Sequence, residues 1–198
     1  MGALWNKIPI TAKTFMAATI AISGIPPLAG FVSKDAILGA AFNARPALWV
    51  IGFITAGMTA FYMFRLVNMT FFGESHVSHE AEHHLHESPA SMTVPLMILA
   101  VLSVVGGWIG WPESLGGSDH FAHFLDPVIA KNAEVAAAAA ESGSRGTEYM
   151  LMLASVLVGL FGIWLAWQFY IKKPSIPDGL ATRFSGVYRL LYNKYYVD

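Results

Sequence analysis

The sequence has no cysteine and little charge, and both absences narrow what the chain can do. Without cysteine, disulfides, thiolate metal sites and cysteine nucleophiles are excluded. Charged residues make up 13% of the chain, whereas a soluble domain typically carries about 25%. The formal net charge is −1 and no basic block is present, so the electrostatic footprint of a nucleic-acid-binding protein is missing. The chain is 55% hydrophobic, which indicates a protein surrounded by lipid.

Four apolar runs are long enough to cross a bilayer, which takes roughly 20 residues. Met92–Trp111 and Tyr149–Ile171 contain no charged residue. Pro46–Phe72 contains only Arg65, and Thr14–Phe42 is interrupted near its middle. The sequence therefore predicts an all-α membrane protein with about four transmembrane helices, the first of them discontinuous.

The charges between these runs predict an orientation. The N-terminal segment and the tail 172–198 are both basic, whereas the loop 112–148 carries six acidic residues against two basic ones. Because basic segments favour the cytoplasmic side, we expect both termini there and the acidic loop outside. Basic and aromatic residues alternate in the tail, which is typical of a segment at the level of the lipid headgroups.

The first apolar run is interrupted at residues 23–30. Pro26 and Pro27 remove two backbone donors, and Gly24 and Gly30 on either side tolerate unusual dihedral angles. We expect one helix to end here and another to begin. Broken helices persist in lipid where they are buried in protein or line a wet cavity, and transporters use them at ion sites.

A lysine and an aspartate follow the break directly. Ser33 is a suitable N-cap for the second helix, which would place Lys34 and Asp35 in its first turn. A lysine that is partly withdrawn from water can exchange a proton, as a proton path requires. The alternative is a plain span from Thr14 to Val32 with Lys34 just beyond it, since about 20 helical residues rise about 30 Å.

Two further features leave alternatives open. Arg65 belongs either to a polar interior chain or to the interface, which its long side chain can reach. The loop 73–91 is rich in histidine and glutamate, and the spacing of four between His79 and His83 suits zinc or nickel on a helix. Such a tract also simply solvates a loop, so its histidines are weak metal candidates: His76, His79, His83, His84 and His86.

The residues around the break carry a resemblance to a known family. The string IAISGIPPLAGFVSKDAIL resembles the broken helix of the antiporter-like domain in proton-translocating NADH–quinone oxidoreductases, or respiratory complex I. It is most similar to the distal antiporter-like subunit, chain L or chain 5. The same resemblance extends over nearly the whole chain, through the segments MGALWNKIPIT, TAFYMFRLVNMTFFGE, MILAVLSVVGGWIG, HFLDPVI and LLYNKYYVD.

This resemblance implies proton translocation coupled to electron transfer in partner membrane subunits. The family's broken helix carries a lysine in the proton path, which Lys34 matches, while Asp35 matches its neighbour and Arg65 matches an arginine in the following helix. NADH, FMN, iron–sulfur clusters and quinone would be bound by partner subunits, and this chain alone would not be catalytic. The resemblance also implies a bacterial inner membrane, with the mitochondrial inner membrane as the alternative. Family members are much longer, so we expect a C-terminal fragment in which Met1 is an interior methionine.

The resemblance also divides the chain. Residues 1–72 would be the end of the antiporter-like domain, 73–91 the histidine-rich loop, 92–171 two further transmembrane helices around the acidic loop 112–148, and 172–198 an interfacial tail. Two other interpretations stay open. One is a subunit of a related cation/proton antiporter or membrane hydrogenase, which shares the broken helix. The other is a stand-alone metal transporter or membrane scaffold that uses the histidine loop.

Overall fold

A computed structural model of the chain describes residues 2–75, 77, 82, 85–112, 115–118, 120–129 and 145–196. These residues form helices and connecting segments, with no strand among them, which confirms the predicted all-α class. The helices are α1 (Pro9–Ile22), α2 (Ala29–Ala44), α3 (Pro46–Val67), η1 (Asn68–Phe72), α5 (Ala90–Val105), η2 (Gly106–Gly110), α6 (His120–Ile129), α8 (Arg145–Trp167), η5 (Gln168–Lys172), α9 (Ser175–Arg183), α10 (Ser185–Tyr192) and η6 (Lys194–Tyr196).

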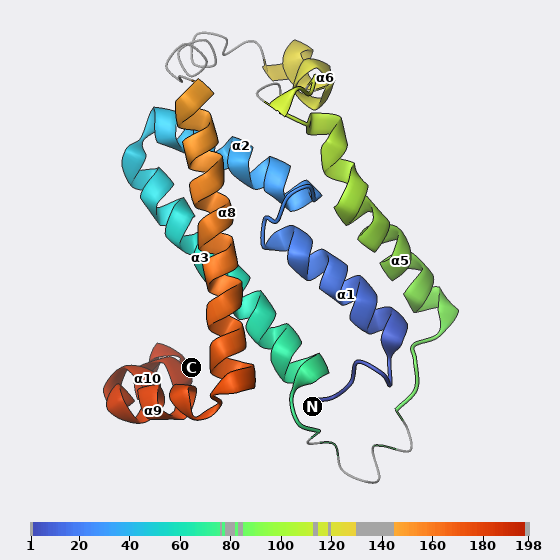
Figure 1. The fold of residues 1–198 in the computed structure, drawn as a ribbon, viewed down its shortest axis with the longest axis vertical. Coiled ribbons are helices and arrows are strands. Elements are labelled where there is room, and N and C mark those ends of the chain that lie inside the picture. Colours follow the sequence, from blue (N-terminus) through green and yellow to red (C-terminus); the bar gives the residue numbers. More distant parts are fainter. Residues whose placement is uncertain are drawn as a thin grey trace.

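The long helices lie side by side along the long axis of the molecule (Figure 1). Within the described residues, three segments are long and apolar enough to cross a membrane: Pro46–Phe72, Ala90–Gly110 and Gly146–Lys172. The shorter helices α1 and α2 follow one another along the same axis and together make the fourth traverse. The predicted discontinuous first span is therefore present. Both marked chain ends lie at the same end of the bundle, and α6 lies at the opposite end.

The outside of the bundle is apolar, and several hydroxyl groups are buried inside it beside apolar residues such as Phe31 and Leu38. Of the largest side chains that are less than 2% exposed, only Val67 is apolar, and the other three carry hydroxyl groups: Thr19, Ser23 and Ser155. Large apolar side chains instead cover the outside of the long helices, such as Ile51, Met58 and Leu99, each 61–64% exposed. Exposure to water costs about 25 cal/mol per Å² of apolar surface, whereas the hydrocarbon of a bilayer removes that cost. The outer surface therefore suits lipid.

The second helix begins earlier than the sequence suggested. The position before its first turn is Leu28, which is extended with φ −78° and ψ 160°, and α2 starts at Ala29. Ser33 is therefore not the N-cap; its hydroxyl lies 3.4 Å from the carbonyl oxygens of Ala29 and Gly30 in its own helix. The prediction that Lys34 and Asp35 lie in the first turn is wrong, because α2 already begins at Ala29, two residues after Pro27.

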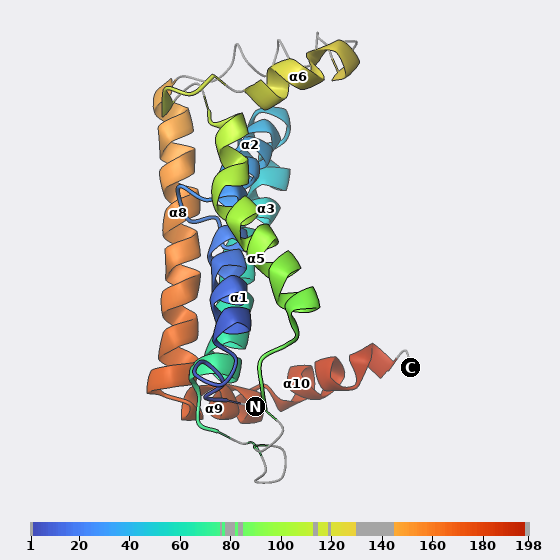
Figure 2. The same ribbon diagram turned by 90° about the vertical axis from the view of Figure 1, so that its right-hand side faces the viewer.

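The tail lies across the end of the bundle. Helices α9 and α10 run at a steep angle to α8 at its C-terminal end (Figure 2). Just before them, the Lys172 ammonium lies over the Trp167 ring, 4.3 Å from its centroid. Exposed apolar and aromatic residues on α10, such as Val187 and Tyr188 at 57% and 52%, accompany exposed Arg189. This composition and orientation suit a segment that lies along a membrane surface.

Candidate functional site

The break between α1 and α2 is built around two glycines with different functions. Gly24 has a φ of +76°, a conformation that L-residues with side chains rarely adopt. Gly30 lies in the first turn of α2, where a β-carbon would overlap the carbonyl of Ala21. Gly30 therefore lets the backbone of α2 approach the backbone of α1 closely, and it has no unusual dihedral angle. Together the two glycines let α2 restart directly against the last turn of α1.

Lys34 reaches back from α2 to the break. Its ammonium donates a hydrogen bond of 2.8 Å to the carbonyl oxygen of Ser23, a residue that is 0% exposed. The end of the Lys34 side chain occupies the space where a side chain on Gly24 would lie. Lys34 itself is partly buried. The lysine is therefore held at the break of the helix and does not extend to the end of a span.

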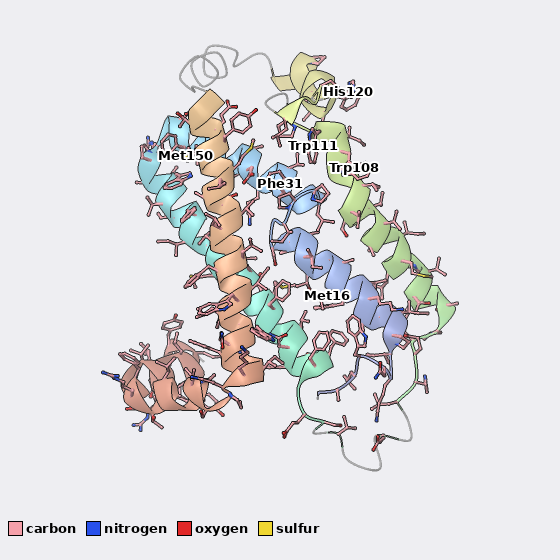
Figure 3. The ribbon with its side chains drawn as sticks, viewed as in Figure 1. Met16, Phe31, Trp108, Trp111, His120 and Met150 are labelled. Carbon is pink, nitrogen blue, oxygen red and sulfur yellow. The ribbon has the colours of Figure 1, made fainter. Side chains whose placement is uncertain are left out.

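A tryptophan from another helix bonds a second carbonyl of the break. The indole Nε1 of Trp108, in η2, donates a 3.1 Å hydrogen bond to the carbonyl oxygen of Pro27. Figure 3 places Trp108 at the upper end of α5, on the side that faces α2. The contact requires the glycine beside it, since a β-carbon on Gly107 would lie 2.5 Å from the Cα of Ala29. Side chains thus bond two carbonyls of the break in place of water.

Asp35 points away from the break, toward α8. Its carboxylate is 9% exposed, and the Ser155 hydroxyl donates a hydrogen bond to its Oδ1. The other oxygen, Oδ2, is buried and has no hydrogen-bond partner among the described residues. One turn further along α8, a β-carbon on Gly159 would lie 3.1 Å from the Ser23 carbonyl oxygen. Helix α8 therefore contacts both the carboxylate and the carbonyl that holds Lys34.

The structure does not add the other candidates to this site. Arg65 lies in the last turn of α3, is exposed, and stacks over the Tyr170 ring at 5.2 Å from its centroid. His86 is exposed, with its Nδ1 3.1 Å from the Glu87 carbonyl oxygen. The other four histidines lie outside the described residues, and the described part of the chain contains no group of three metal-ligating side chains.

Sequence reasoning missed two residues of the site, Trp108 and Ser155. Each had a local signal. Trp108 follows the Gly106–Gly107 pair, which permits close packing of one helix on another. Ser155 is a polar residue in an otherwise apolar run, and it stands four residues before Gly159 in a small-residue spacing that permits close helix contact. Neither signal names its partner, because those partners lie 81 and 120 residues away.

Comparisons with known proteins agree with the resemblance in the sequence. The family described as NADH:quinone oxidoreductase/Mrp antiporter, TM, matches residues 1–59. NAD(P)H-quinone oxidoreductase chain 5 of Picosynechococcus sp. is 45% identical over 217 aligned residues, which cover 100% of this chain and 31% of that protein. Chain 5 of Synechocystis sp. is 39% identical, with 100% and 33% covered. The chloroplastic subunit 5 of Mesostigma viride is 36% identical, with 100% and 29% covered. The chain spans about a third of the length of the curated relatives that it matches.

Proposed function

We propose that the chain belongs to the antiporter-like chain 5, or chain L, subunit family of the NAD(P)H-quinone oxidoreductases and that it takes part in proton translocation across the membrane. Electron transfer from NAD(P)H to quinone would take place in partner subunits of the complex. One observation carries the proposal for this chain: the Lys34 ammonium is bonded to the Ser23 carbonyl inside a broken helix.

The chemistry of this arrangement suits a proton carrier. A lysine amine can both hold and release a proton, whereas a guanidinium cannot release one. A break in a membrane helix presents backbone carbonyls that can hold a cation without water. Asp35, the next residue, supplies a second protonatable group with one unpartnered oxygen among the described residues. Lys34 would carry the proton, and Asp35 would respond to the charge on its neighbour.

The test is proton pumping per electron by the complete complex that carries Lys34→Ala. The proposal requires this ratio to fall while quinone reduction continues and the complex still assembles. A variant complex that pumps normally would remove Lys34 from the proton path.

The proposal extends to the membrane and the parts of the chain. Residues 1–72 would form the end of the antiporter-like domain, 92–171 two further spans, and 172–198 a tail at the headgroup level. We place the protein in a bacterial inner membrane, with both termini and the loop 73–91 on the cytoplasmic side. The common position of the two chain ends, at the end of the bundle opposite α6, supports this topology.

Single cysteines provide a direct test of topology, because residues 1–198 contain no cysteine. We expect Ser75→Cys and Ser185→Cys to react with a membrane-impermeant maleimide in inside-out vesicles and not in right-side-out vesicles. Ser118→Cys, beside α6, should show the opposite pattern. The measurement is labelling of the tagged subunit on a gel. Labelling of Ser75→Cys and Ser118→Cys from the same side would overturn the proposed arrangement.

The histidine loop provides the contrast with a metal transporter. Replacing its five histidines with glutamine keeps the length of the loop and removes every imidazole from it. Proton pumping should stay at the wild-type level, since the proposed proton site uses none of these side chains. Pumping and zinc binding by the complete complex are the measurements, and loss of pumping would favour the metal interpretation. The substitutions are His76→Gln, His79→Gln, His83→Gln, His84→Gln and His86→Gln.

A further inference from the structure

Helix α8 brings one buried hydroxyl to the carboxylate beside Lys34. Ser155 is 1% exposed and Asp35 is 9% exposed, so neither side chain has much access to water. A buried carboxylate requires hydrogen-bond donors, and hydrogen bonds to charged groups are about twice as strong as neutral ones. Among the described residues, the Ser155 hydroxyl is the side-chain donor to Asp35.

The same hydroxyl has a second acceptor. Ser155 Oγ lies 3.2 Å from the carbonyl oxygen of Met152 in its own helix. A serine hydroxyl has one hydrogen, so it can serve the carboxylate or the backbone at a given moment. When Asp35 is ionised, the hydrogen stabilises its Oδ1. When a proton occupies Oδ2, the neutral carboxyl group is a weaker hydrogen-bond acceptor. The Ser155 hydroxyl can then donate to the Met152 carbonyl oxygen instead. Ser155 can thus stay bonded in both protonation states of Asp35.

Small residues on α8 keep this hydroxyl within reach. A β-carbon on Gly159 would lie 3.1 Å from the Ser23 carbonyl oxygen, the acceptor for Lys34. One turn further, a β-carbon on Gly162 would lie 2.5 Å from the Gly57 carbonyl oxygen in α3. Helix α8 therefore lies against α3 and the break at backbone distance. The close approach fixes where Ser155 meets α2.

We propose that Ser155 is a positioning residue of the proton path, which holds the Asp35 carboxylate against α8 and exchanges its hydrogen bond between Asp35 and Met152 as the carboxyl group changes state. This inference rests on the proposed function, because it assigns a residue to the same proton site. It brings α8, which lies outside the broken helix, into the translocation machinery.

The experiment compares threonine with valine at position 155 in the complete complex. The two side chains have nearly the same shape, and only threonine carries a hydroxyl. We expect Ser155→Thr to pump several-fold more protons per electron than Ser155→Val, with equal quinone reduction and equal assembly. Ser103→Ala is the matched control, because among the described residues the Ser103 hydroxyl bonds only the Ala100 carbonyl of its own helix, at 2.8 Å, and should be dispensable. Equal pumping by Ser155→Thr and Ser155→Val would overturn the proposal.

A double-mutant cycle separates positioning from packing. Because Ser155 acts through Asp35, Ser155→Ala should lower pumping alone and cause no further loss in an Asp35→Asn background. If the double variant showed the product of the two separate losses in pumping, Ser155 would act independently of Asp35, and the proposal would be wrong. The cycle also distinguishes the two hypotheses. Normal pumping by Lys34→Ala and Asp35→Asn would refute the proposed function, whereas impaired pumping there with normal pumping by Ser155→Ala would refute only the role of Ser155.

Discussion

Replacing Lys34 with alanine should lower the protons pumped per electron several-fold in the complete complex, while quinone reduction continues. The amine is the group that would take up and release the proton, and alanine has no protonatable side chain. The variant also loses the 2.8 Å hydrogen bond to the Ser23 carbonyl. A lost partner for a buried acceptor costs about 1–3 kcal/mol, so assembly of the complex must be measured beside the pumping ratio.

Two matched variants define what the result means. Lys13→Ala removes the same side chain from an exposed position on α1 and should leave pumping unchanged. Lys34→Arg keeps a positive charge and donors for the Ser23 carbonyl, but a guanidinium does not release its proton. It should therefore pump as poorly as Lys34→Ala. Full pumping by Lys34→Arg would mean that a fixed charge is enough, and would exclude proton transfer through this side chain.

Gly24→Ala should disable the same site by a different route. The φ of +76° at this residue costs alanine about 1–2 kcal/mol. The added β-carbon would also overlap the Lys34 ammonium, so the lysine would have to leave the Ser23 carbonyl. We expect a several-fold lower pumping ratio and a lower temperature of thermal unfolding for the assembled complex.

Gly39→Ala is the control for this substitution. Gly39 lies in the same helix as Lys34, and a β-carbon there would meet no atom within 4 Å. Alanine is favoured over glycine inside a helix by about 1 kcal/mol, so this variant should pump normally and be at least as stable. If Gly24→Ala pumped as well as Gly39→Ala, the break could accommodate a β-carbon at residue 24. The claim that pumping requires Lys34 to be held at the Ser23 carbonyl would then be wrong.

The hydrophobic composition and the lengths of the apolar runs were enough to predict the helical class and the number of traverses. These properties are local, because any segment of roughly 20 apolar residues must bond its own backbone groups in lipid, and a helix does so. The position of the break was equally local, since Pro26 and Pro27 cannot donate backbone hydrogen bonds wherever they stand. The restart of α2 was placed five residues too late, because a good N-cap residue at Ser33 does not compel a helix to begin there.

The partners in the site depended on the tertiary structure. Lys34 bonds a carbonyl 11 residues back, which requires the chain to turn at Gly24 and bring α2 against the end of α1. Trp108 and Ser155 meet the break and Asp35 across 81 and 120 residues. Residue spacing within one helix carries no information about such contacts, because they arise only where separate helices pack. The amino-acid order thus determined the membrane helices, the break and the lysine beside it. The packing of η2 and α8 against them decided which side chains bond the Pro27 carbonyl and the Asp35 carboxylate.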